Sequence, residues 1–386
     1  MAAVEFRLFF DNEPADQSRL DQVDSIVVEQ QVDMAWEARL SIPVCVNGDG
    51  VWEGEEEAWM RPFKRVRVEV KVGQAGFVAL IDGPIVGHDN ARSTIPGTSV
   101  VTLVVHDDSA LLHRQHKISR FTGSDSEIAA QIFDQAQLGA LPSIDDTPSR
   151  TDSPFEETLQ SGTDMQMLRN LVRRNPGWHG YVLPGAQPGQ SIGCFKRLPT
   201  KTDGLPALVL LGEGRNLANF DLRNNARSPA QVQGATLSLK DKKIVSATSS
   251  YRDASLLGDE PALPAGSGET VRRLPPGQSG RQDLDGVAAG AAADSGYSAE
   301  ATGSVLPLCY GGVLSPYRAV DVRLSDSALS APYVIFKVTH SLTRSEYTQA
   351  FTVRGNAVSA SSATSASKPQ ASASLSVSFN VQVGIF

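Results

Sequence analysis

The chain has 386 residues, 33 Gly, 22 Pro and a formal net charge of −8, which indicates about two or three domains richer in strands and loops than in long helices. Such an acidic chain lacks the basic surface of a general nucleic-acid binder, so no stable nucleic-acid binding is expected. The three cysteines form no C-x-x-C pair, and no apolar run reaches the length of a membrane span. The opening residues 4–10 alternate like a strand and do not match a secretory signal.

Alternating apolar residues predict strands throughout the N-terminal part. Residues 4–10 form the first. Residues 26–44 alternate for longer than one strand usually runs, so this segment is either bent or an extended hairpin. Valines alternate with charged residues over 66–72, which predicts a half-buried strand. With further strands expected at 77–81 and 99–105, this part has enough strands for a small barrel.

Two helices are predicted next by their start signals. Residues 124–127 and 163–166 are both capping boxes, in which a Ser or Thr and a Glu or Gln three residues later bond each other's backbone N–H groups. Gly139 is expected to stop the first helix, and Asn175-Pro176-Gly177 the second. A hairpin over 178–198 follows, so these elements predict a small inserted α/β domain.

The strand pattern resumes after this insert. Strands are expected at 208–211, 230–246, 319–324, 333–338 and 349–353.

Between these strands, residues 251–304 are rich in Gly, Ala, Ser, Pro and Asp. Such a segment is too long for an ordinary loop, so it is expected to be disordered or ordered only by a partner, with a short Ala-rich helix at 288–293. Residues 357–374 are Ser/Ala-rich and resemble a linker.

The two β-rich parts on either side of the insert end alike. Each ends with an aromatic-led strand, a turn, and a returning strand in which a Thr stands between apolar residues, at 77–105 and at 333–353. This self-similarity predicts two copies of one supersecondary unit. The sequence therefore favours a β-rich α+β fold with two β-barrels in one chain. A duplicated barrel can meet a six-fold partner as a trimer.

One motif resembles a catalytic site without its structural context. Residues 189–193 match the G-x-S-x-G pattern of a nucleophile elbow, which needs a strand before the Ser and a helix after it. Here a turn precedes Ser191 and a strand follows it, so no catalytic role is expected.

Other charged and histidine-containing motifs favour solvated surfaces. His113 and His116 precede an extended segment, which argues against a metal site. Glu55-Glu56-Glu57 is a charged loop, and Gly212-Glu213-Gly214 lacks the rest of a dinucleotide fingerprint. The helix after the second capping box has one basic face, made of Arg169, Arg173 and Arg174, with docking of an acidic partner as the alternative to a solvated face. We expect no catalytic, cofactor-binding or metal-binding residues.

At the second capping box the sequence resembles a known family. Residues 163–178, TDMQMLRNLVRRNPGW, look like the D-x-x-x-L-x-x-L-x-x-x-x-x-G-aromatic element of phage late control D proteins. These are tail hub proteins, similar in fold to the N-terminal part of VgrG spike proteins. The helix at 124–139 fits the segment before that element, and the hairpin at 333–353 resembles the family's terminal Y-x-h-x-x-V-x-H-x-h element, where h is apolar. The resemblance runs over roughly residues 1–355.

The resemblance implies two tail-tube-like β-barrels per chain with an inserted small α/β domain. Residues 1–110 are then the first barrel, 111–206 the insert, and 207–356 the second barrel with a long Gly/Ala-rich insertion at about 251–304. Residues 357–386 are a Ser/Ala-rich tail with a terminal strand. The segment 251–304 is longer and poorer in apolar residues than this family leads us to expect.

The resemblance also implies a function, that of a structural hub protein in the baseplate of a phage tail or contractile injection system, and not an enzyme. A homotrimer would adapt the hexameric inner tube protein to a trimeric spike protein, beside the baseplate wedge proteins. No cofactor is implied, and such a particle is assembled in the bacterial cytoplasm.

The C-terminal tail is the candidate docking strand for the spike. No spike domain follows in this sequence, so a separate spike protein is expected, and the tail alternates as a strand that adds to a neighbouring chain does. Its candidate residues are Val377, Phe379, Val381, Val383 and Phe386.

Two other functions stay open from the sequence. A β-rich receptor-binding or adhesin module would be favoured by exposed aromatic clusters, for which only Trp52, Trp59 and Trp178 are candidates. A peptidoglycan-degrading enzyme of the same machine would need a catalytic constellation, and no such constellation stands out in the sequence.

Overall fold

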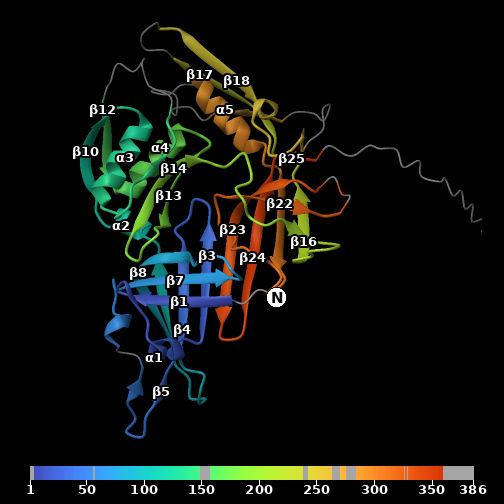
Figure 1. The fold of residues 1–386 in the computed structure, drawn as a ribbon. Helices are drawn as coiled ribbons and strands as arrows, with labels where there is room; N and C mark the ends of the chain where they lie inside the picture. The colour runs from blue at the N-terminus through green and yellow to red at the C-terminus, as the bar shows by residue number, and fades with distance from the viewer. Residues whose placement is uncertain are drawn as a thin grey trace, which may run out of the picture.

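One long antiparallel sheet organises the chain. The computed structural model describes residues 4–54, 57–147, 157–237, 242–262, 270–274, 284–325, 327 and 329–359. Its largest sheet runs in the order β16-β21-β24-β23-β3-β4-β9-β8-β7-β1-β2, with β15 and β22 attached beside β23. Strands from both ends of the chain therefore lie in one sheet (Figure 1).

The N-terminal part supplies one end of this sheet, as its alternating pattern predicts. The elements are β1 (Val4–Phe10), β2 (Glu13–Pro14), α1 (Gln17–Gln22), β3 (Ser25–Gln31), β4 (Glu37–Pro43), β5 (Cys45–Val46), β6 (Trp52–Glu53), the 3-10 turn η1 (Ala58–Met60), β7 (Arg65–Val72), β8 (Val78–Ala91) and β9 (Val100–His106).

The long alternating segment at 26–44 is a hairpin, which decides between the two predicted alternatives. Strands β3 and β4 pair antiparallel, with Val28 opposite Ala38. Asp33 in the turn has a left-handed backbone, φ 62°, a conformation that Asp tolerates better than most residues. The alternation therefore continues in sequence while the chain reverses direction.

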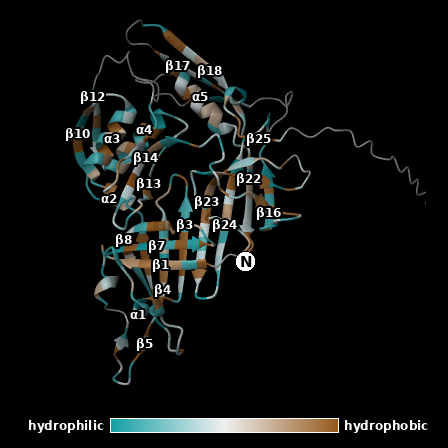
Figure 2. Cartoon of the chain, in the orientation of Figure 1, coloured by the Kyte–Doolittle hydropathy of each residue, from teal (hydrophilic) through white to brown (hydrophobic). Residues whose placement is uncertain are grey.

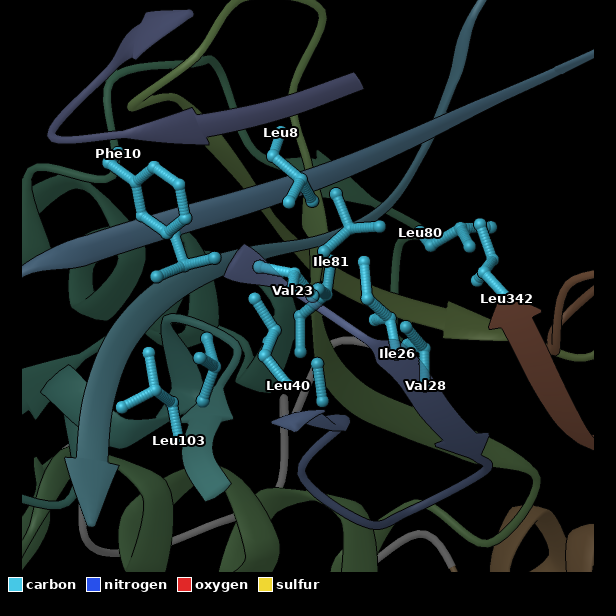
Figure 3. Packing of buried hydrophobic residues seen from close by; sticks show 14 of the residues in the cluster. Leu8, Phe10, Val23, Ile26, Val28, Leu40, Leu80, Ile81, Leu103 and Leu342 are labelled. Carbon is cyan, nitrogen blue, oxygen red and sulfur yellow. The ribbon is translucent and has the colours of Figure 1, made fainter. Parts of the chain in front are cut away.

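A hydrophobic core fills the space between the crossing strands of the N-terminal part. In Figure 1, β1 and β7 run across β3 and β4, and Figure 3 shows Leu8 and Phe10 of β1 over Ile26, Leu40 and Ile81. These side chains are buried. The apolar residues in Figure 2 lie mainly on the strands, as a sheet with one buried face requires.

The inserted part contains both predicted helices and the predicted hairpin. Its elements are α2 (Ser109–Leu112), β10 (Lys117–Thr122), α3 (Asp125–Ala136), β11 (Ser143–Ile144), β12 (Glu157–Gly162), α4 (Asp164–Arg174), β13 (Trp178–Pro184) and β14 (Ser191–Arg197).

Both capping boxes form as predicted, at Ser124 and at Thr163. The first helix ends before the expected glycine, because Gln137 already takes the left-handed conformation. The helices share their own hydrophobic cluster with β13 and β14.

The C-terminal part supplies the other end of the sheet and a separate layer. Its elements are β15 (Leu208–Val209), β16 (Leu217–Asn224), β17 (Ala230–Leu237), β18 (Ile244–Ser250), the 3-10 turn η2 (Tyr251–Asp253), β19 (Glu260–Pro261), β20 (Thr270–Arg273), α5 (Leu284–Ser295), β21 (Ala299–Val305), β22 (Ala319–Arg323), β23 (Pro332–Thr343), β24 (Tyr347–Gly355) and β25 (Ala357–Val358).

Two expectations for this part need correction. Strand β16 is not among the predicted strands, and the strand expected at 230–246 is instead the β17–β18 hairpin of a small separate sheet with β20. The described residues of 251–304 are also ordered within this chain. Its last residues form β21 of the long sheet, and the predicted Ala-rich helix is the longer α5.

Helix α5 is ordered without large side chains because small residues let it approach its neighbours closely. Ala288 and Ala292 are fully buried in a cluster with Val232 of β17 and Ala247 of β18. A Cβ atom added to Gly290 would lie 2.1 Å from the carbonyl oxygen of Pro176, so this close contact with the insert requires glycine.

The long sheet contains two sets of strands with the same connectivity. In the first set the chain order β3, β4, β7, β8, β9 gives the spatial order β3-β4-β9-β8-β7, and in the second β16, β21, β22, β23, β24 gives β16-β21-β24-β23-β22. The register shifts at the same point of both long strands, between Ile85 and Gly87 in β8 and between Ile335 and Lys337 in β23. One difference is that β1 is antiparallel to β7, whereas β15 is parallel to β22.

A buried ionic network joins the first strand set to the inserted part. Arg67 of β7 donates to Asp82 of β8 (2.9 Å) and to the carbonyl oxygens of Gly185 and Gln187 (2.9 and 3.2 Å) in the β13–β14 turn. Arg65 lies between Asp82 and Asp108. Arg67 thus donates to acceptors from two parts of the chain that are far apart in sequence, β8 and the β13–β14 turn.

We predict that Arg67→Met lowers the free energy of unfolding by about 3–5 kcal/mol, because it leaves the buried Asp82 carboxylate short of a partner. Chemical denaturation measures this. The control is Lys71→Ala on the same strand, which breaks the exposed ion pair with Glu5 and should cost less than about 1 kcal/mol. Equal losses in the two variants would show that the network does not stabilise the fold.

Candidate functional site: the polar face and open edges of the long sheet

Eight strands of the long sheet, from β16 to β8, present one buried face and one solvent-facing face. Along β21, for example, Ala299, Ala301 and Gly303 are buried, whereas Thr302 between them is exposed. We call the solvent-facing side the polar face. It carries Asn219, Asp221, Arg223, Glu300, Thr302, Ser304, Thr348, Ala350, Thr352, Arg354, Lys337, Thr339, Ser341, Ser25, Val27, Glu29, Gln31, Glu37, Arg39, Ser41, Thr102, His106, Gly87, Asp89 and Ala91.

Most charges on the polar face are paired, either between strands or along one strand. Arg354 of β24 contacts Glu300 of β21 at 2.7 Å, and Lys337 of β23 contacts Glu29 of β3 at 3.1 Å. Arg39 of β4 bridges Glu37 (2.7 Å) and Asp89 of β8 (2.8 Å). Paired charges and hydroxyls leave this surface wet but without a strong field of either sign, which suits a surface that does not hold a passing molecule.

The two strand sets meet where β23 pairs with β3, a contact that we call the internal junction. The ladder is antiparallel, with His340 opposite Val28 and Thr339 opposite Glu29. Strand β23, whose beginning pairs with β22, thus uses its later part to pair with the first strand of the first set, so the two sets are joined head to tail.

Buried hydrogen bonds fix the register of the internal junction. His340 is fully buried, and its ring nitrogens lie 2.8 Å from the Tyr347 hydroxyl and 3.2 Å from the Gln30 side-chain oxygen. The Gln30 amide in turn donates to the carbonyl oxygen of Leu80 at 2.7 Å. A slip by one residue would break these bonds and turn apolar side chains toward water.

Aromatic contacts at the β3–β4 turn tie the internal junction to the insert. The Asp33 backbone N–H donates to the Tyr317 hydroxyl at 2.8 Å, and the Asp33 carboxylate lies 2.8 Å from His179 of β13. Tyr317 stacks on Tyr181 with ring centroids 3.5 Å apart. Three parts of the chain are therefore held at one point.

Both ends of the eight strands are open among the described residues. Strand β16 pairs with β21 and with no strand on its other side. Residues 87–91 of β8 pair with β9 alone, since β7 covers only the earlier part of β8. Edges of this kind present unpaired backbone groups and are a template for another strand.

Phage tail proteins are among the solved structures with the same fold. A 43 kDa tail protein of prophage MuSo2 from Shewanella oneidensis is 14% identical with a TM-score of 0.58, and the match covers 91% of this chain and 98% of that one. A tail protein from Neisseria meningitidis MC58 is 12% identical with a TM-score of 0.59, over 91% and 96% of the two chains. The chain has the fold of phage tail proteins.

A component of the E. coli type VI secretion system shares the tail-protein fold less closely. It is 12% identical with a TM-score of 0.50, over 87% of this chain and 74% of that one, and it is itself described as similar to the T4 tail proteins gp27 and gp5. No protein family matches the sequence by its profile, and no curated protein matches it. The fold confirms the resemblance to tail proteins that residues 124–178 and 333–353 predict.

Ser191, the one residue in a catalytic-looking motif, has a structural role. It is fully buried at the start of β14, and its hydroxyl donates to Asp108 at 2.7 Å. The strand after it is the context predicted from the sequence. His113 and His116 are exposed, and no group of three or more His, Cys, Asp or Glu able to hold a metal ion occurs among the described residues.

The basic helix face is partly occupied by contacts within the chain. Arg174 lies 3.5 Å from Asp125 of α3, so it is not a free docking charge. Arg169 is exposed in the middle of α4. Glu55, Glu56 and the candidate docking residues of the tail lie outside the described residues. No described helix is both long and apolar enough to cross a membrane.

A pH-dependent stability is expected from the internal junction. Burial lowers the pKa of His340 to about 3. Because the folded pKa lies below the ordinary value of about 6.5, the unfolded chain takes up the proton first as pH falls. The stability that the neutral imidazole contributes is therefore complete above about pH 6.5 and declines toward about pH 3.

We predict that the stability advantage of the wild type over His340→Gln shrinks by up to about 1.4 kcal/mol for each pH unit below about 6.5. Urea denaturation of both chains at about pH 7 and pH 5 measures it. The comparison cancels groups that titrate equally in both chains. An advantage that stays constant over this range would contradict a buried neutral imidazole.

Proposed function

We propose that this protein is a structural hub of a phage tail or contractile injection system baseplate, a homotrimer that adapts the hexameric inner tube to a trimeric spike. One observation carries the proposal: a single sheet built from two strand sets of identical connectivity, joined head to tail. Three such chains present six similar units, which match a six-fold ring by symmetry.

Within this proposal each strand set belongs to one tube-like β-barrel. The division is a first barrel over 1–110, an inserted α/β domain over 111–206 and a second barrel over 207–356. Separate hydrophobic clusters support it, because those of the two strand sets and of the insert are made mostly of residues from within one part. The β17–β18–β20 sheet with α5 is an addition to the second barrel, between β16 and β21.

The polar face is proposed to line the central channel. Its hydroxyls and cross-paired charges suit a passage for nucleic acid or acidic protein cargo, since neither would be held by an unpaired basic patch. The proposed partners are the inner tube protein, the spike and the baseplate wedge proteins, in a particle assembled in the bacterial cytoplasm. No cofactor and no catalytic step belong to this function.

The competing adhesin function finds less support in the structure. Trp59 and Trp178 are buried and Trp52 is half-buried beneath Arg92, so the tryptophans do not form an exposed aromatic cluster. The one catalytic-looking motif gives no support to a peptidoglycan-degrading enzyme, because Ser191 is fully buried.

The test is assembly with the inner tube protein encoded beside this chain. We expect light scattering to give three times the chain mass of 41.2 kDa, and negative-stain images to show three-fold rings capping six-fold tube rings. A chain that stays monomeric with both the tube and the spike protein present would overturn the proposal.

The spike is proposed to dock on the tail at residues 377–386. We predict that deleting residues 360–386 abolishes spike binding in a pull-down while trimer mass and tube binding stay unchanged, because the deletion leaves every described strand in place. The control variant replaces Ser and Ala of 361–374 with Gly and should retain the spike. Retention of the spike by the truncated chain would show that another surface binds it.

A further inference from the structure

We propose that the open edge of β8 in one copy of this chain pairs with the open edge of β16 in the next, in the register that the internal junction already displays. The partner is thus a second copy of the chain, bound head to tail. This inference rests on the proposed trimer and adds the contact that closes it.

The internal repeat places the two open edges in equivalent positions. Strand β8 in the first set corresponds to β23 in the second, and β16 in the second corresponds to β3 in the first. Within the chain β23 pairs with β3, while their counterparts β8 and β16 have no such partner among the described residues. The chain therefore uses this junction once and leaves one copy of it unfilled.

Backbone details confirm that β8 and β23 correspond residue by residue. The N–H of Phe63 donates to the carbonyl oxygen of Ile85 (2.8 Å), just as that of Tyr317 donates to Ile335 (3.3 Å). Phe63 and Tyr317 both have a left-handed backbone, with φ 66° and 62°. Residues 85–91 thus align with 335–341.

The second alignment comes from the ladders around β3 and β16. Val28 lies opposite Ala38 in the first set, and Leu222 lies opposite Ala301 in the second. Ala38 and Ala301 are themselves opposite Val105 and Val353 of the returning strands. Leu222 therefore corresponds to Val28.

Together the two alignments fix the register between copies. In the internal junction His340 lies opposite Val28, so Asn90 is expected opposite Leu222 of the next copy. Thr339 lies opposite Glu29, so Asp89 is expected opposite Arg223 of the next copy.

The side chains at this expected contact are complementary. Asp89 and Arg223 are both exposed on the polar face; Asp89 pairs with Arg39 of its own chain and has room for a second base, whereas Arg223 has no ion-pair partner among the described residues. An acid directly opposite a base stabilises a strand pair. The internal junction carries its own ion pair, Lys337 with Glu29, on the same face.

Phe63 gives an independent indication that a neighbour covers this edge. Its counterpart Tyr317 is held in the internal junction by Asp33 and Tyr181. Phe63 is 63% exposed, with the Arg114 guanidinium over its ring. By the same alignment it would meet the turn that follows β16 in the next copy, which corresponds to the Asp33 turn. A large exposed aromatic beside an open strand edge is typical of a binding surface.

The contact predicts a ring and not a two-fold dimer. It joins two different edges, so each copy keeps one edge free for a further copy until the ring closes. A closed ring leaves neither the β8 edge nor the β16 edge exposed, which removes the tendency of these two edges to aggregate.

Cysteine cross-linking tests the register. In a Cys45→Ser, Cys309→Ser background, which removes the exposed thiols, we expect Asp89→Cys with Arg223→Cys to give disulfide-linked dimers and trimers on a non-reducing gel. The matched control is Asn90→Cys with Arg223→Cys. Shifting by one residue puts the thiols on opposite faces, so no cross-link should form. Cross-linking of the control pair instead would overturn the register.

Variants at exposed residues test the contact with little effect on the fold, since the Arg39–Asp89 pair that Asp89→Arg also breaks is solvent-exposed. Phe63→Ser and Asp89→Arg should each weaken trimer assembly about tenfold or more by light scattering over a dilution series, with unchanged thermal unfolding of the monomer. Adding Arg223→Asp to Asp89→Arg should restore assembly. Ile118→Ser, an exposed apolar residue of the insert, should leave assembly unchanged.

The outcomes separate this inference from the proposed function. A trimer of normal strength in the Phe63 and Asp89 variants, without the 89–223 cross-link, would overturn the β8–β16 contact and leave the hub function standing. A wild-type chain that remains monomeric with its tube and spike partners would overturn both.

Discussion

The fold depends on the antiparallel ladder between β23 and β3. Every backbone N–H and C=O group in a sheet needs a partner, and an edge strand has them on one side only. By pairing β23 of one set with β3 of the other, the chain joins the two sets into one sheet of 13 strands, of which the eight from β16 to β8 carry the polar face. The polar face exists as a single surface because of this ladder.

Contacts around the ladder convert strand pairing into a fixed arrangement of three parts. The buried imidazole of His340 specifies the register, since its two hydrogen bonds reach Tyr347 and Gln30 only in one alignment. The β3–β4 turn then binds both Tyr317 and His179, and Arg67 reaches across to the carbonyl groups of the β13–β14 turn. Because His340 and Arg67 are buried, removing one of their partners costs more than the pair adds in net stability. Such a design favours one arrangement over slipped alternatives.

Local signals in the sequence predicted the local elements well. The capping boxes at Ser124 and Thr163 predicted α3 and α4, because the groups that satisfy a helix N-terminus are close in sequence. Valine alternation predicted β7 for the same reason. Strand β16 was missed because only Phe220 and Leu222 alternate with its polar residues, which is a short signal for a strand. Helix α5 was underestimated because its packing depends on small residues and close approach, which leave little amphipathic pattern.

The sequence by itself determined the strands, the two capped helices and the fact that two β-rich parts end alike, since each rests on neighbours within a few residues. Only the tertiary structure decided that these parts share one sheet, that their strands follow the same order, and that one junction is filled while its counterpart stays open. Strand partners are chosen by contacts between residues hundreds of positions apart, as between His340 and Gln30, and no local pattern records such a pairing. The candidate site is therefore a property of the sheet, and Asp89, Arg223 and Phe63 acquire their meaning from where its edges lie.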